Sequence, residues 1–210
     1  MKLEVKNLVK NFKSTKAVND ISFVIEKNKT LGLLGPNGCG KTTSIGMMLG
    51  LITPSSGEIF INGISLEPKN RIKLLSLMNF ASPYIELPKK LTVKQNLEVY
   101  ARLYGVKNIN NRIEKMVEDL NLHKFLNKIT GELSSGQKNR VALAKSLINE
   151  PKLLFLDEPT ASLDPDVGDF VREYLEKYKQ NNELTILLAS HNMREVERLC
   201  NKVIMMKQGK

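Results

Sequence analysis

A glycine-rich loop between a strand pattern and a helix pattern constrains this 210-residue chain more than any other feature. Residues 31–34 form a short apolar run that predicts a buried strand, and residues 41–51 predict a helix. The loop has the pattern G-x-x-x-x-G-K-T and consists of Gly35, Pro36, Asn37, Gly38, Cys39, Gly40, Lys41 and Thr42. Glycines let successive backbone N–H groups point at one anion, and the helix N-terminus adds partial positive charge. The loop therefore predicts phosphate binding, with Lys41 at the β- and γ-phosphates and Thr42 as a ligand of Mg²⁺.

After residue 30 the sequence alternates between strand-like and helix-like segments, which predicts an α/β fold with a mostly parallel core sheet. The later strands are apolar runs at residues 153–156, 184–189 and 203–206. From residue 92 to about 150 the pattern is predominantly helical. We therefore expect a single domain over residues 1–210. Its parts are a core at about 1–84 and 151–210 and an inserted helical lobe at about 85–150.

Alternating side chains near the N-terminus predict a second, smaller sheet. Residues 3–6 and 21–25 alternate polar and apolar side chains, as half-exposed strands do. Residues 57–61 form a third strand pattern, which runs into the hairpin turn pair Asn62-Gly63. These segments predict a small antiparallel β lobe beside the parallel sheet.

The composition argues against several classes of protein. No apolar run approaches the roughly 20 residues that span a bilayer, and the N-terminus has no signal-peptide core, so we expect a cytosolic chain. Two cysteines and two histidines predict no structural metal. The net charge of +10 fits a solvated lysine-rich surface or attraction to an anionic membrane face. Nucleic acid is not an expected partner, because aromatic residues are only 6% and do not alternate with basic residues.

Two adjacent acids end the strand pattern at residues 153–156. Carboxylates at the C-terminal end of a strand face the crevice where α/β sheets bind ligands. Asp157 can hold Mg²⁺ through its water shell, and Glu158 can polarise an attacking water. The alternative is a solvated strand end with two ordinary acids, but the phosphate loop in the same chain favours the functional interpretation.

The segment Leu133-Ser134-Ser135-Gly136-Gln137 resembles the LSGGQ signature of the ATP-binding cassette (ABC) family, with Ser135 in place of the first glycine. The order of motifs is also similar to that family: phosphate loop, signature, acidic strand, Ser162-Leu163-Asp164 and His191. The resemblance covers essentially the whole chain and implies the fold of a P-loop NTPase.

The resemblance implies a role for each matching residue. Glu158 is expected to be the general base, His191 the sensor of the γ-phosphate, and Asp164 a link between the sites of two subunits. Residues 133–137 are expected to contact ATP held by a second subunit, since the helix that begins there has free N–H groups. The residues expected to bind ATP in this chain are Phe12, Gly35, Pro36, Asn37, Gly38, Cys39, Gly40, Lys41, Thr42 and Thr43.

Some of these residues allow a plainer interpretation. Phe12 could be a core side chain instead of an aromatic that stacks on adenine, and His191 could be an ordinary strand-end histidine. Cys39 could be a redox switch, because a helix N-terminus lowers a thiol pKa, but tolerance of a small side chain is the simpler interpretation.

One position departs from the family pattern. The family places a glutamine after a strand and before an L-T-V segment, which is Leu91-Thr92-Val93 in this chain. Counting without gaps puts Pro83 at the position of that glutamine. Proline has no side-chain amide for Mg²⁺ or for the attacking water, so one expected contact is lost. Ser82 or a water could replace it, whereas Gln95 falls on the next helix.

The resemblance implies an ATPase that uses ATP and Mg²⁺ and forms the motor subunit of an ABC transporter, an exporter more than an importer. It would sit on the inner face of the cell membrane and form a dimer, which we expect to be a homodimer. It would drive a separate permease whose cytoplasmic helix docks near residues 83–88. Two alternatives stay open. One is an ABC ATPase that acts on ribosomes or DNA, and the other is a regulatory module that binds ATP and barely hydrolyses it.

Overall fold

The computed structural model describes residues 1–83, 86–161 and 163–210. It contains a parallel sheet with strand order β6-β7-β8-β3-β9 and an antiparallel sheet with order β2-β1-β4-β5. Both sheets and the α/β class are therefore confirmed. The elements in chain order are β1 (Leu3–Phe12), β2 (Thr15–Ile25), β3 (Thr30–Leu34), α1 (Lys41–Met48), β4 (Ser56–Ile61), β5 (Ile64–Ser65), α2 (Pro68–Leu75), β6 (Met78–Ala81), α3 (Val93–Leu103), α4 (Ile109–Asp119), α5 (Ser135–Leu147), β7 (Leu153–Asp157), α6 (Pro165–Asn181), β8 (Thr185–Ser190), α7 (Met193–Leu199) and β9 (Lys202–Met205).

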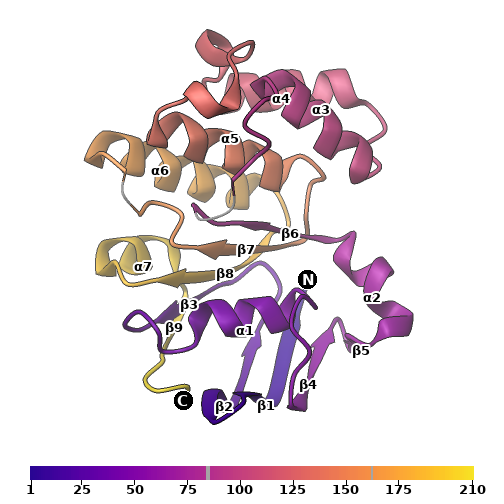
Figure 1. Cartoon of the computed structure of the whole chain (residues 1–210), viewed down its shortest axis with the longest axis vertical. Coiled ribbons are helices and arrows are strands. Elements are labelled where there is room, and N and C mark those ends of the chain that lie inside the picture. The colour runs from indigo at the N-terminus through magenta and orange to yellow at the C-terminus, as the bar shows by residue number, and fades with distance from the viewer. Residues whose placement is uncertain (84–85, 162) are drawn as a thin grey trace.

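The parallel sheet lies across the middle of the molecule. Its strands β3, β7 and β8 are buried along their whole length, which matches their nearly continuous apolar sequences. Helices α3, α4, α5 and α6 lie on one side of this sheet, and α1 with the antiparallel sheet lies on the other (Figure 1). Because parallel strands share a direction, the C-terminal ends of β3, β7 and β8 meet at one edge, where the loops that carry the motifs begin.

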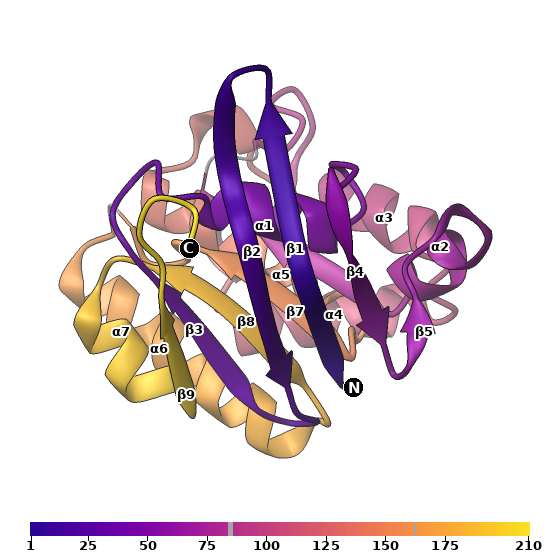
Figure 2. The same cartoon turned by 90° about the horizontal axis from the view of Figure 1, so that it is seen from below.

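Helix α1 fills the space between the two sheets. Its buried residues Ile45, Met47 and Met48 belong to one core cluster with apolar residues of β1, β3, β4 and β7. Figure 2 shows β1 and β2 crossing in front of α1 in the view from below. This packing fixes the direction of α1 relative to the sheet and so holds the start of the helix beside the strand edge.

The antiparallel sheet has the hairpin that the sequence predicts. β4 pairs with β5 through the turn Asn62-Gly63, and both turn residues have positive φ values of 50° and 78°. Two positive φ values are typical of the type I′ turn that Asn-Gly favours. The first strand pattern is longer than predicted, since β1 continues to Phe12 and pairs with β2 and β4.

The helical segment from residue 92 to 150 is broken into three α-helices, with two short 3-10 helices at His123–Phe125 and Thr130–Glu132 between α4 and α5. α3 begins at a capping box of Thr92 and Gln95, and α5 begins at a second capping box of Ser134 and Gln137. The apolar faces of α3, α4 and α5 pack with α6 and with β7 and β8 in the second core cluster. Among the described residues, no helix is long and apolar enough to cross a membrane.

Two details differ from the sequence prediction. The helix expected over residues 41–51 ends at Met48, because Gly50 has a φ of +65° and turns the chain. Helix α2 was not predicted, since it buries only Leu74 and has no continuous apolar face.

Candidate functional site

The glycine-rich loop connects β3 to α1 at the edge where the parallel strands end. Gly40 has a φ of +108°, and a Cβ atom there would lie 2.4 Å from the Ala17 carbonyl oxygen. A Cβ atom on Gly35 would lie 2.2 Å from the Met206 carbonyl oxygen, so neither glycine can be replaced without moving the backbone. In the described part of the chain, no side chain forms a capping hydrogen bond at the start of α1 at Gly40. The N–H groups of that turn therefore remain available to an anion.

The remaining loop residues differ in exposure. Pro36, Asn37 and Gly38 are exposed on the outer side of the loop, whereas Cys39 is buried beneath it. The Cys39 sulfur occupies the space that a Cβ atom on Gly35 would enter, at 2.7 Å. Cys39 is therefore a packing residue of the loop in this structure.

Lys41 and Thr42 begin α1 and point toward different partners. The Lys41 side chain is only 5% exposed, and its Nζ donates to the carbonyl oxygens of Gly35 at 2.6 Å and Pro36 at 3.2 Å. Thr42 Oγ1 donates to Asp157 Oδ2 at 2.9 Å, across 115 residues of sequence. The first turn of α1 is thus joined both to its own loop and to the end of β7.

The two acids at the end of β7 are both buried and take different directions. Asp157 closes the strand and faces Thr42. Burial raises the pKa of Asp157, and the Thr42 hydrogen bond offsets part of that effect. Glu158 leaves the strand with a φ of +54°, which is strained for a residue with a side chain, and its N–H donates to the Ala189 carbonyl oxygen at 2.8 Å.

His191 follows the neighbouring strand β8 and meets Glu158. Its Nδ1 lies 2.8 Å from Glu158 Oε1, and its backbone N–H donates to Glu158 Oε2 at 3.4 Å. The contact with Oε1 is within ion-pair distance but lacks hydrogen-bond geometry, so Oε1 has no hydrogen-bond donor among the described residues. Lys41 Nζ is 4.0 Å from the same oxygen. The structure thus brings together three of the residues that the sequence singled out.

This donor set fits a nucleotide phosphate and Mg²⁺. Mg²⁺ prefers hard oxygen ligands, and the Thr42 hydroxyl lies in contact with the Asp157 carboxylate. A buried carboxylate such as Asp157 gains from a nearby cation, because burial alone disfavours its charged form. The loop N–H groups and the Lys41 ammonium supply the positive field that phosphate oxygens require.

The signature segment lies at the N-terminus of α5. Ser134 is the N-cap residue, and its hydroxyl accepts from the Gln137 N–H while Gln137 Oε1 accepts from the Ser134 N–H. Leu133 is buried, whereas Ser134 and Ser135 are exposed. Gly136 is half-buried, and a Cβ atom there would lie 3.3 Å from the Val167 side chain. Within the described part of the chain, no hydrogen bond or ion pair joins residues 133–137 to loop residues 35–42.

The other expected site residues lie farther from the strand edge. Asp164 is the N-cap residue of α6, without a side-chain hydrogen bond to the helix, and Ser162 lies outside the described residues. Thr43 is half-buried on α1. Phe12 ends β1 and is 47% exposed, with Lys10 Nζ at 5.0 Å from the ring centroid. The alternative that Phe12 is a core side chain is therefore wrong.

The stretch around Pro83 follows β6 at the same edge of the sheet. Pro83 is exposed and lines a cavity of about 270 Å³ together with Ser82, Leu87 and Leu163. Gln95 lies in the capping box of α3, where its Oε1 accepts from the Thr92 N–H. Gln95 is thus committed to the helix start, as its position in the sequence suggested.

Sequence reasoning missed a buried acid close to these residues. Glu195 lies on α7, four residues after His191, and accepts a hydrogen bond from Thr160 Oγ1 at 2.9 Å. The sequence signal was weak, because α7 has only seven residues and carries acids on both its buried and its exposed side. Only the fold brings Thr160 and Glu195 together.

A glycine-rich loop ahead of a helix, beside an acidic strand end in a parallel sheet, defines a P-loop NTPase. The family model of the ABC transporter matches residues 18–161, so the chain belongs to the ABC transporter family as an ATP-binding cassette.

Two relatives of known name are similar over almost the whole chain. The ABC transporter ATP-binding protein NatA of Bacillus subtilis (strain 168) is 38% identical over 204 residues, which are 94% of this chain and 80% of NatA. The Nod factor export ATP-binding protein I of Rhizobium sp. (strain N33) is 34% identical over 210 residues, which are 99% of this chain and 68% of that protein.

A solved structure agrees with this assignment. The cbiO1 protein from Clostridium perfringens, part of the ABC transporter complex cbiONQ, is 31% identical with a TM-score of 0.86. The match covers 99% of this chain and 85% of that one. The P-loop NTPase fold with the ABC arrangement of sheets is therefore shown by sequence and by structure.

Proposed function

We propose that this chain hydrolyses ATP in the presence of Mg²⁺ and, as the motor subunit of an ABC transporter, drives a separate membrane permease. The observation that carries the proposal is the meeting of three functional groups at one oxygen. His191 Nδ1 lies 2.8 Å and Lys41 Nζ lies 4.0 Å from Glu158 Oε1, beside the start of α1. A phosphate-binding lysine, a carboxylate and an imidazole at this spacing suit phosphoryl transfer to water.

The loop and Lys41 bind and orient the phosphates. Lys41 Nζ exchanges its hydrogen bonds with the Gly35 and Pro36 carbonyl oxygens for contacts with phosphate oxygens. Thr42 Oγ1 and, through water, Asp157 are the residues that would hold Mg²⁺. When bound, Mg²⁺ neutralises charge on the phosphate oxygens.

Glu158 acts as the general base and His191 orients the reaction. Glu158 Oε1 has no hydrogen-bond donor among the described residues, so it can accept a proton from a water. The neighbouring His191 side chain is largely exposed and lies beside Glu158, and in this proposal its imidazole contacts the γ-phosphate. Asp157 contacts Thr42 and Glu158 contacts His191, so the proposed base and the proposed metal ligand have different neighbours.

A second copy of the chain would complete the site. Ser134 and Ser135 are exposed at the N-terminus of α5, where N–H groups suit a phosphate of ATP bound by the other copy. Two such contacts give a head-to-tail homodimer with two ATP molecules, in which Asp164 links the sites. ATP binding closes this dimer, and hydrolysis releases it.

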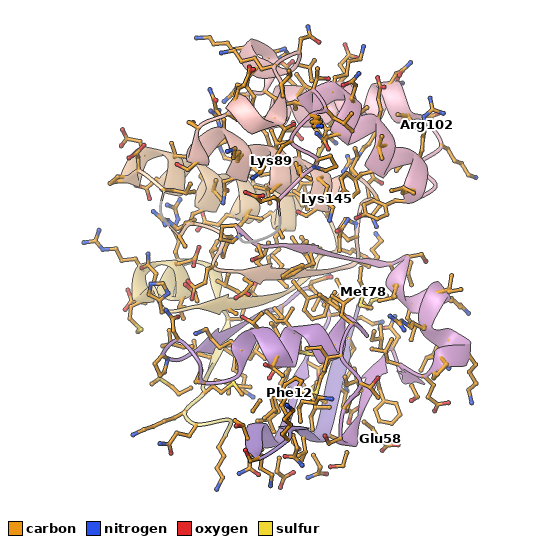
Figure 3. All side chains as sticks on the ribbon, viewed as in Figure 1. Phe12, Glu58, Met78, Lys89, Arg102 and Lys145 are labelled. Atoms are coloured by element: carbon orange, nitrogen blue, oxygen red, sulfur yellow. The ribbon has the colours of Figure 1, made fainter. Side chains whose placement is uncertain are left out.

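The permease docks where the helical lobe meets the core. The cavity beside Pro83 and Leu87 has a mostly apolar lining. Lys138 also lines it, as does Lys89, which pairs with Glu86 at 2.8 Å. This lining suits a short amphipathic helix whose acidic residue would meet Lys138. Figure 3 places Lys89 on the opposite side of the parallel sheet from Phe12, so a helix docked at Lys89 does not cover the antiparallel sheet. In this proposal the helical lobe, residues 85–150, transmits the motion, and the chain sits on the cytoplasmic face of the membrane.

The direction of transport is proposed to be export. A relative that is 34% identical over 210 residues is named for the export of Nod factor, which supports this direction. Uptake of radiolabelled Nod factor, the cargo in that relative's name, by inverted vesicles that contain the chain and its permease would support export, and uptake by right-side-out vesicles would contradict it.

Hydrolysis by purified wild-type protein and by Glu158→Gln tests the proposal. We expect the variant to lose on the order of 10²-fold or more in kcat and to form a stable dimer in size-exclusion chromatography with ATP and Mg²⁺. Glu114→Gln, at an exposed position on α4, serves as the control and should keep wild-type turnover. Equal rates in wild type and Glu158→Gln would contradict the role of Glu158.

A further inference from the structure

A buried carboxylate lies outside the groups assigned to hydrolysis. Glu195 is only 1% exposed, whereas Glu197 on the same short helix α7 is exposed. Burial raises the pKa of Glu195, and hydrogen bonds with Ser190 and Thr160 counter part of that effect. A buried acid is costly unless it is hydrogen-bonded, so its partners indicate what it does.

Thr160 connects Glu195 to the turn that follows Glu158. Thr160 Oγ1 donates to Glu195 Oε1 at 2.9 Å, and Arg172 Nη1 donates to the same Thr160 oxygen at 3.3 Å. Arg172 is itself held by Asp169 at 2.9 Å on α6. The turn of residues 158–160 is therefore anchored from α6 and from α7 at once.

Ser190 connects Glu195 to the base from the other side. Its hydroxyl donates to Glu158 Oε2 at 3.5 Å and accepts from the Asn192 N–H at 3.0 Å. The Ser190 hydroxyl is also close enough to Glu195 to lower the pKa of that carboxyl, and it has one proton to donate between the two acids. Ser190 immediately precedes His191, so the same contacts fix the backbone from which the His191 side chain extends.

We infer that Glu195 is a positioning residue that holds Glu158 and His191 in their mutual geometry through Thr160 and Ser190. The inference rests on the proposed ATPase function and adds to it a residue outside the groups proposed to contact nucleotide or Mg²⁺. Glu158 has a strained φ of +54°, and a strained residue persists only where its surroundings fix it from several directions. The Ala189 carbonyl holds the Glu158 N–H, and the Thr160–Glu195 hydrogen bond holds the turn two residues later.

Steady-state kinetics of Glu195→Ala, Glu195→Gln and the control Glu197→Ala give the first test. We expect Glu195→Ala to lower kcat for ATP on the order of 10-fold to 10²-fold, because small displacements of reacting groups have effects of that size. KM for ATP should stay within about threefold, since the phosphate loop is unchanged. Glu195→Gln should keep kcat within about threefold of wild type, because its amide oxygen can still accept from Thr160. Glu197→Ala should match wild type.

Histidine NMR gives a second test that needs no turnover. The chain has two histidines. His123 lies between α4 and α5, with its Nε2 at 3.2 Å from Glu118 Oε2, so its ring signals serve as an internal reference. In Glu195→Ala and in Thr160→Val we expect the ring signals of His191 to move toward those of free imidazole while those of His123 stay. Thr160→Ser should restore the His191 signals that Thr160→Val changes, because it keeps the hydroxyl.

The outcomes separate this inference from the proposed function. If the wild type does not hydrolyse ATP, the ATPase proposal fails, and the His191 signals alone decide whether Glu195 positions the pair. If Glu195→Ala melts below the assay temperature, the pair Thr160→Val and Thr160→Ser decides in its place. Unchanged His191 signals in Glu195→Ala and Thr160→Val overturn the inference, as does a Glu195→Gln variant as slow as Glu195→Ala.

Discussion

The phosphate loop and the signature segment both lie at the N-terminus of a helix, but their surroundings differ. At the start of α1, Lys41 is buried and Thr42 is hydrogen-bonded to an acid from a distant strand. At the start of α5, Ser134 and Ser135 are exposed, and among the described residues the Ser134 side chain bonds only within its own capping box. The first helix start has its partners in the same chain. We propose that the second receives a phosphate group from outside the chain.

Lys41→Ala should produce the largest effect, because it removes the ammonium group from the phosphate loop, the helix start whose partners lie in the same chain. We expect kcat/KM for ATP to fall on the order of 10³-fold, and binding of a fluorescent ATP analogue to weaken as well. The exposed Lys73→Ala on α2 is the control and should behave like wild type. Turnover that survives the loss of Lys41 would contradict the assignment of the loop.

Gly136→Asp should separate turnover from binding at the exposed helix start. An aspartate in the first turn stabilises a helix, and the Val167 side chain needs to shift only by a few tenths of an ångström to admit its Cβ atom, so the variant should fold. Its charge repels a phosphate brought to that turn. We expect kcat to fall on the order of 10²-fold while the Kd for ATP of the isolated chain stays within about twofold. Lys94→Asp, at the corresponding position of α3, gains the same favourable helix interaction and should keep its kcat.

Phe12→Ala should affect binding only and more weakly. The exposed ring at the end of β1 is proposed to stack on adenine, and stacking contacts of this kind contribute about 1 kcal/mol. We expect the Kd for ATP to rise about fivefold, with kcat at saturating ATP unchanged. Isothermal titration calorimetry measures the first quantity, and a Kd equal to that of wild type would remove Phe12 from the site.

Ser134→Ala and Thr92→Ala compare two capping boxes that have the same design. Both variants should lose about 1 kcal/mol of stability and about 2–4 °C in Tm, because each removes one N-cap hydroxyl. Only Ser134→Ala should also lower turnover, because only that helix start is proposed to meet ATP. Equal turnover in the two variants would show that the Ser134 hydroxyl serves the helix alone.

The sequence predicted those parts of the molecule that depend on local pattern. The loop of residues 35–42, the apolar strands and the Asn62-Gly63 hairpin follow from glycine positions and from short apolar runs, and all are present. Helix α2 was missed because a helix with only Leu74 buried has no apolar face to detect. Ser134 was correctly placed at the start of a helix because capping residues carry a local signal.

Contacts between distant segments could not be predicted from the residues themselves. The hydrogen bond between Thr42 and Asp157 spans 115 residues, and the one between Thr160 and Glu195 spans 35. Each depends on the order of strands in the sheet and on how α6 and α7 pack beside it. The resemblance to the family implied that Thr42 and Asp157 both serve one Mg²⁺ site, so the first contact could be expected from it. No motif pointed to the second contact.

The measurement that tests the central claim most directly is a mixing experiment between two inactive variants. Lys41→Ala and Gly136→Asp are each expected to be inactive alone, and a head-to-tail dimer of the two contains one site with an intact loop and an intact signature. The account predicts that mixing equal amounts restores about a quarter of wild-type hydrolysis, because half the dimers are mixed and half their sites are intact. A mixture as inactive as its components would contradict the claim that the exposed start of α5 completes the site of a second copy.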